Sequence, residues 1–238
     1  MTGLDLLAAS AIVTAGAALQ GAVGFGFALV AAPLLALIDP RLVPGSLLCA
    51  ALVLTLLTAH RERHAIDTSG IGWGLVGRLP GTALGAAALL RISAGGMELV
   101  LGALVLVAVA MSASGLHFRP TPRALVGAGV LSGFMGTMTA IGGPPLAMVY
   151  QHAPGAQLRG TLAGYFVIGA AVSLVALALV GRFGRVELAG ALSLLPGVLL
   201  GFVCSARLAA LLDRGYTRGA VLAVSGAAGT LVIVRQLF

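Results

Sequence analysis

Long runs of residues without any charge make up most of this chain, and they restrict its possible folds more than any other feature does. The uncharged stretches are 6–38, 42–59, 79–90, 99–116, 124–151, 160–181, 188–206 and 219–234. A helix needs about 20 apolar residues to cross the hydrocarbon core of a bilayer. The run 79–90 reaches that length when 71–77 joins it, which places Arg78 inside the helix. The pattern predicts an all-α, polytopic bundle of transmembrane helices with eight hydrophobic segments.

The composition agrees with a lipid environment. Hydrophobic residues supply 59% of the chain and charged residues 9%, against roughly 45–50% and about 25% in soluble domains. The 35 glycines and the few aromatic residues suit close contact between membrane helices. All 14 cations are arginines scattered between the apolar runs, which is typical of topology signals rather than of a nucleic-acid surface. We therefore expect no nucleic-acid partner.

Neither the cysteines nor the N-terminus indicates a secreted, disulfide-bonded protein. Cys49 and Cys204 lie inside apolar runs, so we expect both to be packing residues. The first five residues lack the basic flank of a signal peptide. We therefore expect the first apolar run to stay in the mature protein.

Two of the uncharged runs are too long for one straight helix. Residues 6–38 would form a rod of about 50 Å, against about 30 Å of hydrocarbon. Both long runs carry glycine and proline near the middle, at 21–33 in the first run and at 133–145 in the second. The sequence predicts a broken helix or a tight hairpin in each.

These two glycine-rich segments are related by an internal repeat. Gly21, Gly24 and Pro33 lie 112 residues before Gly133, Gly136 and Pro145. Leu79-Pro80-Gly81, Gly85 and Arg91 lie 116 residues before Leu195-Pro196-Gly197, Gly201 and Arg207. The spacing predicts two homologous transmembrane repeats, at about 1–117 and 118–238.

The relative orientation of the two repeats depends on how often each long run crosses the membrane. One crossing gives four spans per half and parallel repeats, whereas two crossings give five spans and inverted repeats. The loop arginines divide 7 to 6 in the first arrangement and 8 to 5 in the second. The positive-inside rule favours the second, with eight arginines on the cytoplasmic side: Arg61, Arg63, Arg119, Arg123, Arg159, Arg207, Arg214 and Arg218.

The paired breaks are the best candidates for a solute site, because irregular backbone at membrane depth must be buried in protein or line a polar cavity. Unwinding at 24–26 and 142–144 exposes N–H groups at half-helix N-termini, which favour anions. Thr137 and Thr139 add hydroxyls beside the second break. The alternative is that the glycines only permit close helix packing, but their recurrence in both repeats favours a site.

The segments from Gly21 to Pro33 and from Gly133 to Pro145 resemble the two signature segments of the TauE/SafE sulfite exporter family. The resemblance extends over essentially the whole chain, including its length and its duplication. It implies transport of small sulfur-containing anions such as sulfite, sulfoacetate or other organosulfonates, coupled to H⁺ or driven by the membrane potential. A multi-pass protein of the bacterial inner membrane is implied, without a cofactor, and a homodimer is left open.

Three polar side chains near the breaks complete the candidate site. Arg78 is the one charge deep within a helical segment, where a charge is costly enough to indicate function; the alternative is a cation that bridges helices or reaches an interface. Gln20 and Gln151 lie beside the breaks, where they can bind an oxyanion or cap a helix. The candidate substrate-binding residues are Gln20, Gly24, Phe25, Gly26, Arg78, Thr137, Thr139, Gly142, Gly143, Pro144 and Gln151.

Other classes of function find little support in the sequence. His60-Arg-Glu-Arg-His64 lacks the His-Glu-x-x-His order of a zinc protease, so we expect an arginine-rich loop and no metal site. No nucleophile elbow or phosphate-binding loop is present, and we expect no catalytic residue. The remaining alternatives are a transporter or channel for a different small anion or organic acid, an intramembrane enzyme and a scaffold subunit.

Overall fold

The computed structural model describes residues 2–116, 118–212 and 217–237, which form helices and no strand. The helices in these ranges are α1 (Gly3–Val23), α2 (Phe27–Ile38), α3 (Gly45–Arg61), α4 (Thr68–Leu89), α5 (Ala94–Ala113), α6 (Pro122–Thr139), α7 (Gly143–Tyr150), α8 (Gly155–Leu179), α9 (Arg185–Leu212) and α10 (Thr217–Leu237). Short 3-10 turns at Pro40–Leu42 and Arg63–Ala65 connect α2 to α3 and α3 to α4. Six of the predicted segments each contain one helix, and each of the two over-long segments contains two.

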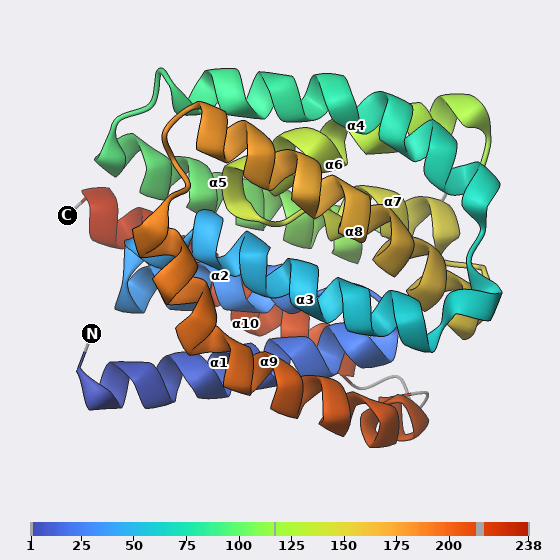
Figure 1. The fold of residues 1–238 in the computed structure, drawn as a ribbon, viewed down its shortest axis with the longest axis horizontal. Coiled ribbons are helices and arrows are strands. Elements are labelled where there is room, and N and C mark those ends of the chain that lie inside the picture. The colour runs from blue at the N-terminus through green and yellow to red at the C-terminus, as the bar shows by residue number, and fades with distance from the viewer. Residues whose placement is uncertain (1, 117, 213–216, 238) are drawn as a thin grey trace.

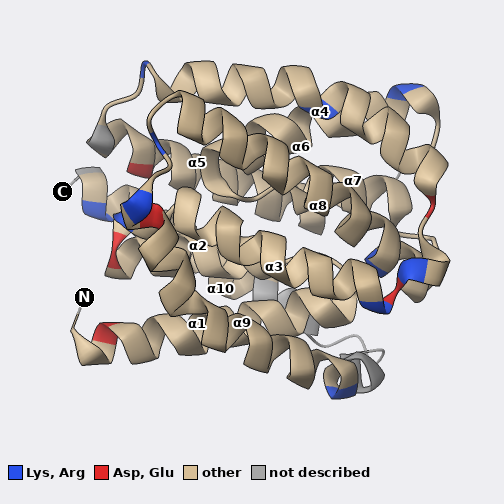
Figure 2. Cartoon of the chain, in the orientation of Figure 1, with Lys and Arg blue, Asp and Glu red and all other residues tan. Residues whose placement is uncertain are grey.

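The helices lie side by side along the long axis of the molecule, with α4 at one edge and α1 and α9 at the other (Figure 1). Charged residues gather at the two ends of the bundle and leave its middle almost uncharged (Figure 2). Across the described residues, four helices are long and apolar enough to cross a membrane: Gly3–Val23, Gly95–Ala113, Gly155–Leu179 and Arg185–Leu208. The prediction of an all-α membrane bundle is confirmed.

The outer surface of the bundle is apolar, as a lipid-facing surface must be. Leu84, Leu90, Leu179 and Val203 are each more than half exposed. Water would penalise so many exposed aliphatic side chains on a monomeric protein. Lipid tails are as apolar as leucine, so exposing these side chains to a bilayer carries no free-energy penalty.

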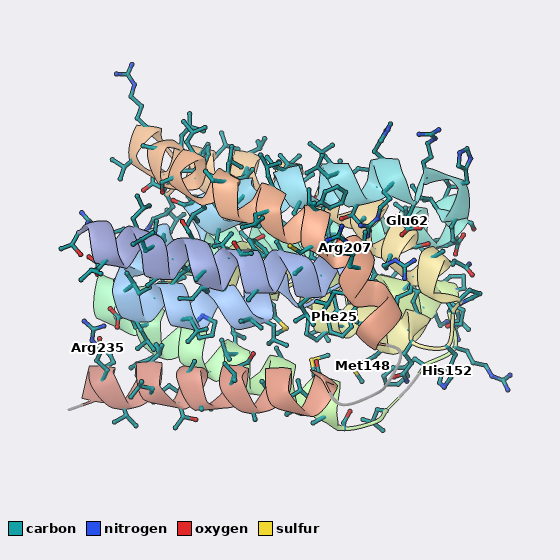
Figure 3. All side chains as sticks on the ribbon, turned by 90° about the horizontal axis from the view of Figure 1, so that it is seen from below. Phe25, Glu62, Met148, His152, Arg207 and Arg235 are labelled. Atoms are coloured by element: carbon teal, nitrogen blue, oxygen red, sulfur yellow. The ribbon has the colours of Figure 1, made fainter. Side chains whose placement is uncertain are left out.

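Hydrogen bonds near the helix termini define the two ends of the bundle. At the end that we call the Glu62 end, Arg159 binds Glu62, and Gln151 donates to Leu116 O. At the other, the Glu187 end, Arg182 donates to Leu89 O and Ile92 O, and Arg235 donates to Leu37 O. Figure 3 shows the labelled Arg235 at one end and Glu62, His152 and Arg207 at the other.

Glycine allows the closest helix contacts in the bundle, those of α4 with α6 and of α1 with α9. A Cβ atom added to Gly77 or Gly81 of α4 would overlap a backbone carbonyl of α6. A Cβ atom on Gly133 of α6 would overlap Arg78 O of α4. Likewise, Gly201 of α9 lies against Thr14 O of α1. Small residues thus bring the backbones together, as in other membrane helix pairs, and the two interfaces place both helix breaks in the interior.

Candidate functional site

The first long run breaks where it was predicted to break. Helix α1 ends at Val23, and Gly24 and Gly26 follow with φ values of 103° and 116°. Such left-handed conformations are readily available only to glycine. The chain then reverses into α2, whose first N–H, that of Phe27, donates to Gln20 Oε1 at 3.2 Å. The 24–26 segment is therefore a tight hairpin inside the bundle.

The second long run also breaks, two residues before the predicted 142–144 segment, because Gly143 and Pro144 already belong to the next helix. Helix α6 ends at Thr139, Ala140 adopts a left-handed conformation with φ 65°, and α7 begins at Gly143. Pro144 and Pro145 occupy the first turn of α7, where a missing N–H leaves no helical hydrogen bond unmade. Pro144 and Pro145 therefore start α7. The chain itself turns at the left-handed glycines of the first break and at the left-handed Ala140 of the second.

A small cavity lies between the two breaks. Its lining includes the first turn of α2, from Gly26 to Leu29, and the start of α7, from Gly142 to Pro144. Helix α3 contributes Leu48, Ala51 and Thr55, and helix α8 contributes Phe166 and Ala170. The interior has room for about 40 Å³. A water molecule needs roughly 10–15 Å³ by this measure, so the cavity holds a few water molecules or one anion with few heavy atoms.

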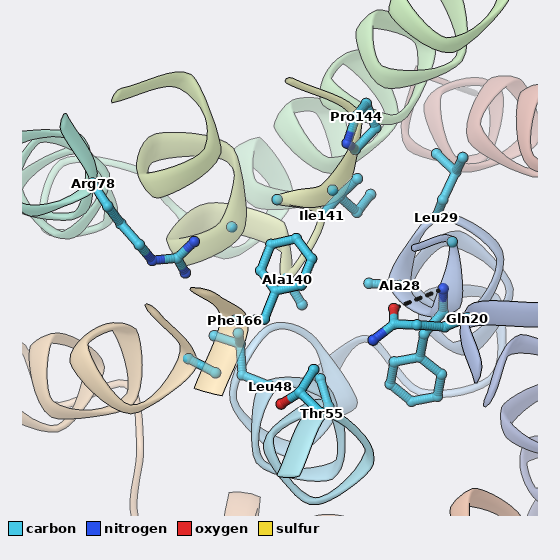
Figure 4. Close-up of a pocket in the computed structure, with 17 residues that line it drawn as sticks. Gln20, Ala28, Leu29, Leu48, Thr55, Arg78, Ala140, Ile141, Pro144 and Phe166 are labelled. Atoms are coloured by element: carbon cyan, nitrogen blue, oxygen red, sulfur yellow. Dashed lines mark hydrogen bonds between the residues drawn. The ribbon is translucent and has the colours of Figure 1, made fainter. Parts of the chain in front are cut away.

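Arg78 brings the only full charge among the cavity-lining residues. Its side chain is 2% exposed, and Figure 4 shows its guanidinium and the Gln20 amide approaching the cavity from opposite sides. The guanidinium donates to Ser132 Oγ and to Ser173 Oγ, both at 3.1 Å. It also lies 5.2 Å from the centre of the Tyr165 ring.

The charge of Arg78 has no anionic partner in the described parts of the chain. No carboxylate lies within ion-pair distance of it, and Arg78 Nε has no hydrogen-bond partner. A buried cation without a counter-ion is costly. Hydroxyl groups and one aromatic face compensate it in part. The arrangement leaves a positive charge that a bound anion would neutralise.

The two half-helices add to this positive potential. The N-terminus of a helix carries roughly half an elementary charge, and the first residues of both α2 and α7 line the cavity. Arg78 adds one full unit of charge, so the potential at the site is positive. An apolar wall formed largely by Leu29, Leu48, Ile141 and Phe166 excludes competing water and strengthens the attraction.

The structure places the predicted site residues in three groups. Those that line the cavity are Gln20, Gly26, Arg78, Gly142, Gly143 and Pro144. Those that lie next to it are Phe25, which packs on Gly143, and Thr137, which shares a 2.9 Å hydrogen bond with Ser173. Those engaged elsewhere are Gly24 against Arg159, Thr139 in the cap of α6, and Gln151 with Leu116 O at the surface.

Sequence reasoning missed the hydroxyl residues that hold Arg78. Ser132 donates to Gly142 O at 2.7 Å, so one serine connects the guanidinium to the second helix break. Ser173 and Thr137 extend the same network across α8 and α6. A serine inside an apolar run is a usable signal, since Ser and Thr often bind across membrane helices.

Comparison with known proteins assigns the chain to a family. The profile described as "Sulfite exporter TauE/SafE" matches residues 8–232. The chain belongs to the TauE/SafE family. Membership of this family implies a membrane exporter of sulfite or another anion. No curated protein and no solved structure matches the chain significantly.

The Gln20 amide provides a first test of the site. Gln20→Leu should weaken sulfite binding by about tenfold, because the variant removes an amide N–H donor beside the cavity. Binding is measured as the sulfite-dependent shift in melting temperature of the purified protein. Gln151→Leu is the matched control, since Gln151 binds Leu116 O at the surface. Equal sulfite affinity in Gln20→Leu and Gln151→Leu would show that Gln20 does not contribute to the site.

Proposed function

We propose that this protein is a multi-pass secondary transporter of the bacterial inner membrane that exports sulfite or a similarly small sulfur-containing anion. One observation carries the proposal: the Arg78 guanidinium enters a cavity between two half-helix N-termini and has no carboxylate partner in the described chain. A small oxyanion would accept hydrogen bonds from these groups and neutralise their charge. The cavity volume favours sulfite over the larger organosulfonates.

The packing of the helices supports inverted repeats as part of this proposal. Helix α1 pairs with α9 as α6 pairs with α4, and α5 packs on α10 as α3 packs on α8. This pattern is unchanged when residues 1–117 are exchanged with 118–238. Helix α3 starts at the Glu187 end, where Gly45 lies against Glu187, whereas its counterpart α8 starts at the Glu62 end, where Arg159 binds Glu62. Two inverted halves would explain both observations, with the Glu62 end in the cytoplasm.

The driving force follows from the lining of the cavity. Its described lining contains neither a carboxylate nor a histidine, so no lining side chain is suited to carry a proton at neutral pH. We therefore favour export driven by the membrane potential, which expels anions from a negative interior. A proton could still accompany the anion as its own conjugate acid.

Counterflow in proteoliposomes tests the proposal directly. Liposomes that contain the pure protein and unlabelled sulfite should accumulate radiolabelled sulfite from outside, and protein-free liposomes should not. Sulfoacetate in excess should compete more weakly than sulfite, because it exceeds the cavity volume. Exchange of chloride or acetate without sulfite would instead favour a transporter of a different anion. Absence of any anion exchange by folded protein would contradict the transport function.

A further inference from the structure

Helix α3 runs past three features in turn, and its residues give their order along the bundle. Gly45, at its start, lines a large cavity at the Glu187 end. Leu48 and Thr55, further along, line the central cavity. Glu62 follows the last residue of α3 at the Glu62 end. At 1.5 Å per residue, these features span about 25 Å, which is close to the thickness of the hydrocarbon core.

The large cavity at the Glu187 end and the central cavity are lined by residues of neighbouring turns of α3. Gly45 and Leu48 are three residues apart in α3, which corresponds to about 4.5 Å along the helix. The large cavity has a volume of about 350 Å³, several times that of the central one. Arg41, Glu98, Arg182 and Glu187 contribute polar and charged groups to its lining. It has the size and polarity of a water-filled vestibule.

The Glu62 end is closed by a network of charged groups. Glu62 Oε1 accepts a hydrogen bond from Arg159 Nε at 2.9 Å and lies 3.4 Å from Arg61 Nε. The side chains of Arg61, Glu62 and Arg159 are only 27%, 15% and 21% exposed. These three residues form what we call the Glu62 cluster.

The Glu62 cluster joins four helices from both halves of the chain. Arg61 donates to Ser205 Oγ of α9 and to Gly21 O of α1, and its guanidinium lies 4.9 Å from the centre of the Phe202 ring. Arg159, at the start of α8, packs against Gly24 in the first helix break. The cluster therefore lies next to the hairpin that carries one wall of the central cavity.

We infer that the Glu62 cluster is the cytoplasmic gate of the transport path, and that the structure is the conformation that opens toward the vestibule at the Glu187 end. The inference rests on the proposed function, since it supplies the route by which an anion reaches the central cavity. Breaking the Glu62–Arg159 pair separates α3 from α8 and opens the path from the cytoplasm. The pair closes the path again when the anion has left through the vestibule. A partly buried ion pair suits this role because removal of either partner strongly disfavours the closed state.

A cysteine reporter in the central cavity tests the gate. In a Cys49→Ala/Cys204→Ala background, Thr55→Cys places a thiol on the cavity wall. A membrane-impermeant thiol reagent is applied to right-side-out vesicles and to inside-out vesicles. In the otherwise unchanged protein, reaction should be faster from the Glu187 side. Arg159→Gln should accelerate reaction from the Glu62 side by about tenfold, the effect of a modest population shift.

Matched variants make the result specific. Arg63→Gln changes an exposed arginine at the same end outside the cluster, so its labelling should equal that of the parent. Glu62→Gln removes the other partner and should reproduce Arg159→Gln, and it replaces that variant if Arg159→Gln does not fold. Equal labelling in Glu62→Gln and Arg63→Gln, or equal rates from both sides in the parent, would overturn the gate.

The labelling is independent of the identity of the substrate. Sulfite counterflow with unchanged labelling in Arg159→Gln would retain the proposed function and contradict the gate. Altered labelling without any sulfite exchange would retain the gate and contradict the proposed function.

Discussion

Arg78→Met is expected to reduce sulfite binding by about 100-fold and to abolish counterflow, because it removes the only full charge among the described residues that line the cavity. Charge-assisted hydrogen bonds contribute about 1.5–3 kcal/mol, and each 1.4 kcal/mol is about tenfold in affinity. The melting temperature should be unchanged or higher, because methionine fills a similar volume without burying a charge. Binding and melting are measured on the same purified preparations.

The melting temperature distinguishes a binding role from a bridging role for Arg78. If the guanidinium mainly joins α4 to Ser132 and Ser173, then Arg78→Met should melt at a clearly lower temperature. Arg91→Met is the control, because Arg91 is exposed just after the end of α4 and should change neither property. Full sulfite affinity in Arg78→Met would exclude the proposed site.

Gly133→Ala in α6 is expected to cause a large loss of stability. The new Cβ would overlap Arg78 O and crowd Thr82 N in the facing helix α4. Backbone atoms cannot move aside as a flexible side chain does, so we expect destabilisation of about 3 kcal/mol. The yield of monodisperse protein and its melting temperature report the effect.

Gly127→Ala provides the matched comparison on the same helix. Nothing lies within 4 Å of a Cβ atom at Gly127. Alanine is a better helix former than glycine by about 1 kcal/mol, so this variant should be as stable as the parent or slightly more stable. Equal melting temperatures of Gly133→Ala and Gly127→Ala would contradict the close contact between α4 and α6.

The breaks and the buried arginine could be predicted from local sequence. A 33-residue uncharged run cannot cross a bilayer straight, and glycines mark where the backbone can turn, as Gly24 and Gly26 do. The helix around Arg78 followed from the length of the apolar segment alone. The matched positions were less precise, since Gly133 and Gly136, the counterparts of Gly21 and Gly24, lie inside α6 and not at the second break.

The partners of Arg78 could not be predicted, because they depend on how distant helices pack. Ser132 and Ser173 are separated from Arg78 by 54 and 95 residues, and an isolated serine leaves no periodic pattern. Gln151 shows the opposite error, since it follows the second break in sequence but lies away from the cavity. The eight residues of α7 separate it from the break by about 12 Å.

The distance in sequence between Arg78 and its serine partners also affects how the protein is made. Ribosomes add roughly 5–20 residues per second, so α4 is complete roughly 5–20 s before Ser173 exists. Arg78 has neither hydroxyl partner until Ser132 is made and lacks the second until Ser173 is made, and an arginine at the centre of a bilayer costs about 2.5–3.5 kcal/mol even by the lowest scale. Arg78 therefore gains its full set of hydroxyl partners only when α8 has been made. A chain truncated between α6 and α8 would leave Arg78 short of one hydrogen bond, which makes such fragments natural targets for membrane proteases.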